Sequence, residues 1–196
     1  MGNKAGRRCA GCRKESCNGC SLFNRIQNPK DREVIFPEDF VPDPRQGFGI
    51  AFDVGTTTLA ALLFDLTDGH QLGALTGVNP GRFAGADVIS RITYAAGSEE
   101  NAKRLQGTLI RRLDEMAEAL ADGKEISRVT VAGNTAMCES LLGMSVEGLC
   151  RAPFHKDYQG CCSKKGEELG FSFLKAAEIF VLPSIDGYVG ADALSV

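Results

Sequence analysis

The chain has 196 residues, of which 43% are hydrophobic and 24% charged, with a net charge of −3. This composition is ordinary for a soluble globular domain, and the charge argues against a broad basic surface for nucleic acid or anionic membranes. No apolar run reaches the roughly 18 residues of a membrane span. No apolar segment follows the basic N-terminus as in a signal peptide. We therefore expect a cytoplasmic protein that binds neither nucleic acid nor membranes.

The N-terminal region is rich in cysteine. Four of the eight cysteines, Cys9, Cys12, Cys17 and Cys20, form two Cys-x2-Cys pairs with four residues between the pairs. In a reducing cytoplasm, clustered thiols indicate a metal site rather than disulfides, and four thiolates suit one ion or cluster. The short separation favours an iron–sulfur cluster over a zinc ribbon. A compact Zn²⁺ site and unliganded thiols remain open alternatives.

Three zones along the chain differ in composition. Cysteine dominates the first, four prolines interrupt the second, and regular apolar periodicity begins with the third. Proline removes backbone donors and restricts regular structure, which is typical of a linker. We predict a metal-binding segment over residues 1–28, a linker over 29–46 and a folded domain over 47–196.

Apolar periodicity and turn residues predict the elements of the third zone. In chain order, strands are expected over 47–53, 58–65 and 71–78, helices over 86–96 and 99–121, a strand over 127–132, a helix over 134–142, a strand over 178–183 and the start of a helix over 190–196. The stretch 79–85 is expected to be a loop, and 151–170 to be irregular or weakly helical. The resulting order, βββαβαβα, is that of one lobe of the actin-like ATPase (ribonuclease H-like) fold, an α/β fold.

The segment Asp53-Val-Gly-Thr-Thr-Thr58 joins the first two predicted strands. Gly55 lets the backbone turn sharply and approach an anion, and N–H groups in such a turn converge on an oxyanion. Thr56, Thr57 and Thr58 add hydroxyl donors. Asp53, at the strand end, is placed to hold Mg²⁺ through water or to orient a nucleophilic water. We predict that this turn binds the phosphates of ATP, with a plain β-hairpin carrying a polar tip as the alternative.

A second candidate segment lies at a strand-to-helix junction. Gly133 permits a tight turn there, and Asn134 is suited to cap the helix that follows. We predict that Gly133, Asn134 and Thr135 belong to the cofactor site, with Asn134 and Thr135 near the terminal phosphate or a partner group, and with Asp53 and Asn134 as the catalytic residues. A helix cap without any further role is the alternative.

The remaining candidates are two aspartates and four cysteines. Asp186 and Asp192 follow the last predicted strand, and we assign Asp192 to the cofactor site because its carboxylate suits Mg²⁺. A helix cap or a solvent-facing carboxylate fits both aspartates equally well. Cys138 and Cys150 are expected to be small buried residues. The adjacent Cys161 and Cys162 lie in a loop rich in glycine and lysine, so a redox or ligand role stays open.

Six motifs occur in one order along the chain. They are Asp53-Val-Gly-Thr-Thr-Thr58, Val78-Asn-Pro80, Gly85-Ala-Asp-Val-Ile-Ser-Arg-Ile92, Val131-Ala-Gly-Asn-Thr-Ala-Met137, Arg151-Ala-Pro-Phe154, and Leu182-Pro-Ser with Gly187-Tyr-Val-Gly-Ala-Asp192. As a set covering about residues 47–196, they resemble the ASKHA domain of the reductive activators of corrinoid proteins. The resemblance implies that ATP binding and hydrolysis help an iron–sulfur centre to reduce a Co(II) corrinoid to Co(I). The implied partners are a corrinoid protein and an electron donor, with a homodimer as a further possibility.

Two features depart from the family pattern. The cysteine spacing is not the plant-type Cys-x4-Cys-x2-Cys, and no second phosphate loop or adenosine-binding segment precedes Val196. We therefore expect the N-terminal half of an ASKHA domain, which by itself binds ATP poorly and hydrolyses it hardly at all. The alternatives are another ASKHA enzyme, such as a small-molecule kinase or a 2-hydroxyacyl-CoA dehydratase activator, and a non-catalytic metal-bearing binding module.

Overall fold

The computed structural model describes residues 23–25, 45–150, 154, 157 and 162–183. Its strands are β1 (Phe23–Arg25), β2 (Phe48–Val54), β3 (Thr58–Asp65), β4 (Gln71–Val78), β5 (Ile126–Gly133), β6 (Cys162–Lys165) and β7 (Glu178–Val181). Its α-helices are α1 (Val88–Ala96), α2 (Glu99–Ala121), α3 (Thr135–Leu142) and α4 (Gly166–Leu169). Two 3-10 helices are η2 (Pro80–Ala84) and η3 (Glu147–Cys150).

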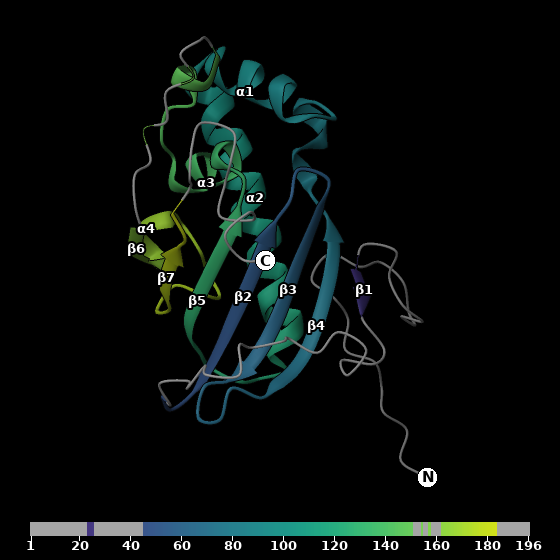
Figure 1. Cartoon of the computed structure of the whole chain (residues 1–196), viewed down its shortest axis with the longest axis vertical. Helices are drawn as coiled ribbons and strands as arrows, with labels where there is room; N and C mark the ends of the chain where they lie inside the picture. Colours follow the sequence, from purple (N-terminus) through teal and green to yellow (C-terminus); the bar gives the residue numbers. More distant parts are fainter. Residues whose placement is uncertain (1–22, 26–44, 151–153, 155–156, 158–161, 184–196) are drawn as a thin grey trace.

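The strands of the described residues form one sheet in the order β1-β4-β3-β2-β5-β7-β6 (Figure 1). β2, β5 and β7 are parallel to one another, whereas β3, β4, β1 and β6 each run antiparallel to a neighbour. After the short β1, the three antiparallel strands β2, β3 and β4 follow one another along the chain, and helices then alternate with strands. This arrangement confirms the predicted α/β lobe. The expected helix over 190–196 lies outside the described residues.

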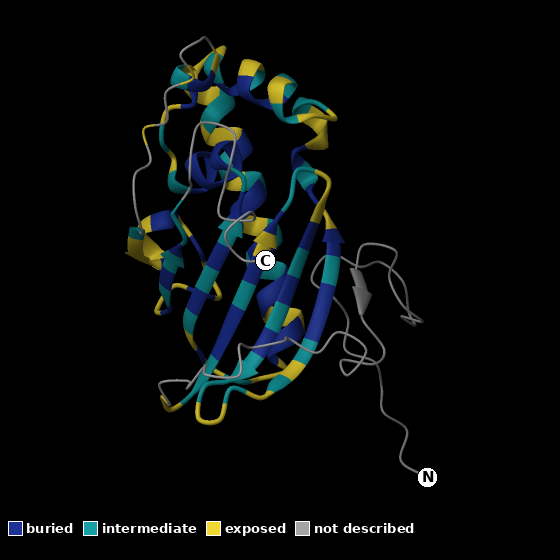
Figure 2. Ribbon diagram, viewed as in Figure 1, coloured by how far each residue is buried: buried dark blue, intermediate teal, exposed yellow. Residues whose placement is uncertain are grey.

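The core lies between the sheet and the helices that cover one of its faces; α2 crosses behind the sheet in Figure 1. On β2, Ile50, Phe52 and Val54 are each at most 2% exposed, whereas Asp53 is exposed. This alternation follows from the two-residue period of a strand, and Figure 2 shows it as stripes along the sheet. The helix α2 supplies the opposite wall through apolar residues at intervals of three or four, namely Leu105, Leu109, Leu113, Met116 and Leu120.

Side-chain caps determine where the helices begin. Asp87, Ser98 and Asn134 precede α1, α2 and α3, and each accepts the backbone N–H three residues ahead at 2.9 to 3.1 Å. Such caps satisfy donors that have no partner within the helix. The helix α3 ends at Gly143, whose φ of 68° is a left-handed conformation that glycine adopts without steric cost. The starts of α2 and α3 agree with the sequence because cap chemistry is local, whereas α1 begins two residues later than predicted, after the Asp87 cap.

The structure differs from the expected elements at three places. The expected loop 79–85 contains η2, and the expected irregular stretch 151–170 contains β6 and α4. β6 is an edge strand of Cys-Ser-Lys-Lys with mostly exposed side chains, and such polar edges show no apolar alternation to predict them. β1 adds a short strand within the cysteine-rich segment and pairs with β4.

Two of the cysteine expectations are tested. Cys138 is 1% exposed, which confirms the expectation of a buried small residue. The same expectation for Cys150 was wrong, because this residue is exposed at the end of η3. η3 turns only one face towards the core, where Leu149 is buried, so its last residue stays outside. Cys162 is half-buried on β6, and Cys161 lies outside the described residues.

Asp114 on α2 anchors the segment between α4 and β7. Its carboxylate accepts the backbone N–H groups of Ser172 and Phe173 at 2.8 Å each and of Leu174 at 3.0 Å. The Asp114→Ala variant leaves three amides without this acceptor, so we expect the free energy of unfolding to fall by about 2 kcal/mol. Urea titration followed by circular dichroism measures this loss. Glu118→Ala on the same helix also replaces an acidic residue by alanine, at an exposed position, and serves as the control. Equal stability of the two variants would contradict the anchoring role.

Other predicted features lie outside the described residues. These are the N-terminal cysteines, Asp186 and Asp192. Among the helices that the structure does describe, none combines the length and the apolar character that crossing a membrane requires.

Candidate phosphate-binding site

The two predicted site turns lie side by side at one edge of the sheet. β2 and β5 are parallel, and their last residues, Val54 and Gly133, are register partners. Asp53 is likewise the partner of Ala132. The carboxyl ends of parallel strands are where open α/β sheets bind ligands. The register therefore brings both candidate segments to an edge that suits ligand binding.

The turn after β2 is tight and presents polar groups. A Cβ atom at Gly55 would lie 2.6 Å from the carbonyl oxygen of Thr58, which is closer than Cβ atoms approach backbone, so a larger residue would have to move the turn. Thr57 and Thr58 are exposed, and Thr56 is half-buried. Asp53 is exposed just before the turn. Hydroxyl groups and a carboxylate thus face solvent next to a sharply turned backbone.

Asn134 joins the two turns. Its Oδ1 accepts the N–H three residues ahead at 3.1 Å and caps α3, while its Nδ2 donates to Thr56 Oγ1 at 3.1 Å across 78 residues of sequence. A helix cap uses only the oxygen, so the second bond gives Asn134 a role beyond capping. A Cβ at Gly133 would lie 2.9 Å from the last carbonyl oxygen of β2, so this close approach favours glycine. Thr135 is 0% exposed, in contrast to Thr57 and Thr58.

Asn79 is a component of this edge that its sequence pattern did not reveal. It is 2% exposed, and its Nδ2 donates to the carbonyl oxygen of Gly55 at 2.8 Å. Its Oδ1 accepts the N–H of Gly81 at 2.8 Å, and its own N–H donates to the carbonyl oxygen of Thr57 at 2.9 Å. Asparagine before Pro-Gly is a local turn signal, but the contact with Gly55 depends on how β4 pairs in the sheet.

Arg91 on α1 contacts the same methionine side chain as Asn79. It is 1% exposed, and its Nε donates to the carbonyl oxygen of Gly85 at 3.1 Å. Its Nη1 lies 3.8 Å from the thioether sulfur of Met137, and the Nδ2 of Asn79 lies 3.7 Å from the same sulfur. A chain of contacts therefore runs from α1 through α3 and Asn79 to the turn after β2.

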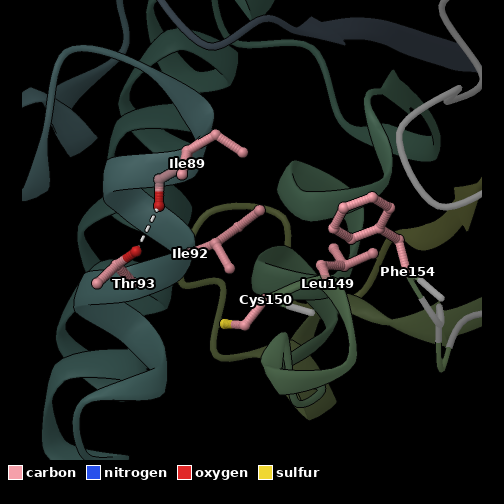
Figure 3. A pocket seen from close by; sticks show the side chains of 6 residues that line it. All are labelled: Ile89, Ile92, Thr93, Leu149, Cys150 and Phe154. Carbon is pink, nitrogen blue, oxygen red and sulfur yellow. Dashed lines mark hydrogen bonds between the residues drawn. The ribbon is translucent and has the colours of Figure 1, made fainter. Parts of the chain in front are cut away.

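A pocket of about 470 Å³ opens elsewhere, between α1 and η3 (Figure 3). It is lined by Ile89, Ile92, Thr93, Leu149, Cys150 and Phe154. None of these residues belongs to the turns after β2 and β5. By the 3.6-residue period of the helix, the lining residues of α1 lie on the side away from Arg91. The pocket is therefore separate from the candidate phosphate site.

Comparison with known proteins places the chain in a family. A family model described as "RACo middle region" matches residues 48–196. The chain belongs to this family. It is 31% identical over 166 residues to "Corrinoid activation enzyme RamQ" of Eubacterium limosum, covering 81% of this chain and 28% of the relative. A solved structure named "Reductive activator for corrinoid,iron-sulfur protein" superposes with a TM-score of 0.71 at 29% identity, covering 76% of this chain and 24% of that chain.

The chain thus spans about a quarter of the length of these two relatives. Membership of the RACo middle region family confirms the resemblance stated from the motifs. The matched range contains all candidate site residues of the two turns, namely Asp53, Gly55, Thr56, Thr57, Thr58, Gly133, Asn134 and Thr135. It begins after the four N-terminal cysteines, so the match says nothing about them.

A metal centre stays a prediction. Within residues 23–25, 45–150, 154, 157 and 162–183, no group of three or more histidine, cysteine or acidic side chains is arranged to hold a metal ion. Cys9, Cys12, Cys17 and Cys20 lie outside these ranges.

Proposed function

We propose that this chain is part of an ATP-dependent reductive activator that converts the Co(II) corrinoid of a partner protein to Co(I). Membership of the RACo middle region family and the names of both relatives support corrinoid activation. The observation that best supports ATP use is the 3.1 Å hydrogen bond from Asn134 Nδ2 to Thr56 Oγ1, because it connects the two candidate turns directly. A plain hairpin tip needs no such bond.

The polar groups at this edge fit a phosphate chain. Phosphate oxygens need several donors and a backbone that they approach closely. The exposed hydroxyls of Thr57 and Thr58 would bind these oxygens, and Asn134 would hold the Thr56 hydroxyl in place for the same purpose. Gly55 keeps the turn tight, since any Cβ there meets the Thr58 carbonyl.

The acidic group at the edge fits a magnesium ion. The carboxylate of Asp53 is exposed and lies next to the turn, so it would hold Mg²⁺ through water or orient an attacking water. Gly133 and Thr135 would shape the wall near the terminal phosphate. Hydrolysis of bound ATP would supply the free energy that an uphill reduction of the corrinoid requires. Asp192 remains a further proposed ligand of this site.

The proposed electron carrier is an iron–sulfur cluster on the four N-terminal cysteines, with Zn²⁺ as the alternative metal. In this proposal residues 1–28 carry the cluster, 29–46 link it, and 47–196 form the ATPase lobe. The partners are a corrinoid protein and an electron donor. Visible absorbance and EPR spectra of anaerobically purified protein test the cluster; bound zinc without visible absorbance would remove the electron-carrier role.

The phosphate site is tested by titrating the chain with ATP and Mg²⁺ and recording the backbone amide resonances. We expect the amides of Gly55, Thr56 and Thr57 to shift, and Asp53→Asn to weaken binding about tenfold when Mg²⁺ is present, because it loses a charged metal ligand. Asp68→Asn, at the opposite end of β3 in the β3–β4 turn, is the matched control. Shifts that avoid the turn after β2, or an Asp53→Asn variant with unchanged affinity, would contradict the assignment.

The activity is tested by following the visible absorbance of a Co(II) corrinoid protein during reduction. A full-length protein that carries this region is the suitable sample, since the chain spans only about a quarter of the length of its relatives. We expect Co(I) to accumulate only with ATP. The same rate without ATP would count against the ATP-dependent mechanism.

A further inference from the structure

Arg91 carries a positive charge in the interior of the protein. Its side chain is 1% exposed, and its Nη2 is a buried atom without a hydrogen-bond partner among the described residues. Burial of an unpaired charge is costly, and buried polar groups normally find partners. An arginine at this position in spite of the cost of burial indicates a role other than stabilising the fold.

The charged neighbours of Arg91 do not neutralise it. In the described part of the chain, none of the ion pairs includes Arg91. Burial lowers the pKa of Arg91, the nearby Arg82 lowers it further, and Asp87 opposes this effect. The carboxylate of Asp87 is engaged with the N–H and hydroxyl of Ser90 at the start of α1. Because a guanidinium stays protonated in proteins, Arg91 remains a cation with incomplete compensation.

This cation lies close to the candidate phosphate site. Three successive contacts, of 3.8, 3.7 and 2.8 Å, lead from Arg91 Nη1 to the Met137 sulfur, on to Asn79 Nδ2, and on to the carbonyl oxygen of Gly55. The separation of Nη1 from that oxygen is therefore no more than about 10 Å, over which a charge in a protein interior still acts appreciably. Protein atoms fill this space, since Asn79 and Met137 are each 2% exposed.

We propose that Arg91 is a positioning residue of the phosphate site whose buried positive charge strengthens the binding of polyanions at the Asp53–Thr58 turn without touching them. The charge counteracts the repulsion that Asp53 exerts on a phosphate chain. Its screening by salt is weak because the charge is buried. This inference rests on the proposed phosphate site and adds a specificity for highly charged ligands to it.

The test compares Arg91→Lys, which keeps the charge, with Arg91→Met, which removes it at similar length. The probes are orthophosphate and tripolyphosphate without metal, and the readout is the dissociation constant from the amide shifts of Gly55 and Thr56. We expect Arg91→Met to weaken tripolyphosphate binding about tenfold and orthophosphate binding less, since the loss grows with ligand charge. Arg91→Lys is expected to stay within about twofold of wild type for both probes.

A structural role for Arg91 predicts a different pattern. If Arg91 only holds Met137 and Gly85 in place, Arg91→Lys and Arg91→Met weaken the binding of both probes by the same factor. That result would overturn the inference. Arg91→Gln is a second neutral variant in case Arg91→Met does not fold, and the amide spectrum of each variant reports its folding. Wild-type affinity in the neutral variants overturns the inference alone. Failure of tripolyphosphate to shift the Gly55 and Thr56 amides of the wild type overturns the phosphate site and the inference together.

Discussion

Replacement of Asn79 by alanine will lower the free energy of unfolding by about 3 kcal/mol and weaken phosphate binding at the turn after β2. Asn79 is buried and uses both ends of its amide: Nδ2 donates to the Gly55 carbonyl oxygen and Oδ1 accepts the Gly81 N–H, each at 2.8 Å. Alanine leaves the half-buried carbonyl of Gly55 and the buried N–H of Gly81 without these partners. The loss of stability is larger than the net contribution of a hydrogen bond, because the group that loses its partner stays desolvated and makes no bond in return.

Urea titration gives the loss of stability of Asn79→Ala, and ATP titration followed by amide shifts gives the change in affinity. The matched control is Asn101→Ala, which removes a single amide hydrogen bond, to the Tyr94 carbonyl oxygen, outside the site. We expect the control to lower the free energy of unfolding by about 1 kcal/mol and to leave the ATP affinity unchanged. Equal effects of the two variants on both quantities would show that Asn79 does not hold the turn.

Replacement of Gly55 by alanine will distort the turn between β2 and β3 and remove most of its phosphate affinity. The added Cβ would lie 2.6 Å from the carbonyl oxygen of Thr58, and this contact is with backbone, which cannot rotate away as a flexible side chain does. We expect the free energy of unfolding to fall by about 2 kcal/mol, as for other overpacked positions. The affinity falls because the hydroxyls of Thr56 and Thr57 move with the turn.

The control for Gly55→Ala is Gly107→Ala on the surface of α2, where a Cβ meets nothing within 4 Å. Alanine is the better helix former, so this variant is expected to gain up to about 1 kcal/mol of stability and to bind ATP as wild type does. The comparison separates the general effect of a methyl group from its position. An unchanged ATP affinity in Gly55→Ala would contradict the assignment of the turn to phosphate.

Much of the fold was predictable because its signals are local. β3, β4 and α2 have the bounds that their apolar spacing predicts, and Asn134 caps α3 as expected. In a strand with one buried face, apolar and polar residues alternate, and on the buried face of a helix apolar residues recur every three to four positions. β6 was missed for the same reason, since an exposed edge strand has no apolar face to show such a period.

The site divides in the same way. The local chemistry can be read from the residues alone, namely a glycine turn with three threonines after an aspartate, an asparagine cap, and the family likeness that the RACo middle region match confirmed. Which of these groups meet depends on the tertiary structure. Parallel pairing of β2 with β5 places Asn134 on Thr56, and the antiparallel β4 delivers Asn79 to Gly55. The burial of Arg91 also depends on how the helices pack. Contacts between residues far apart in sequence follow from strand register and helix placement, which no local pattern encodes.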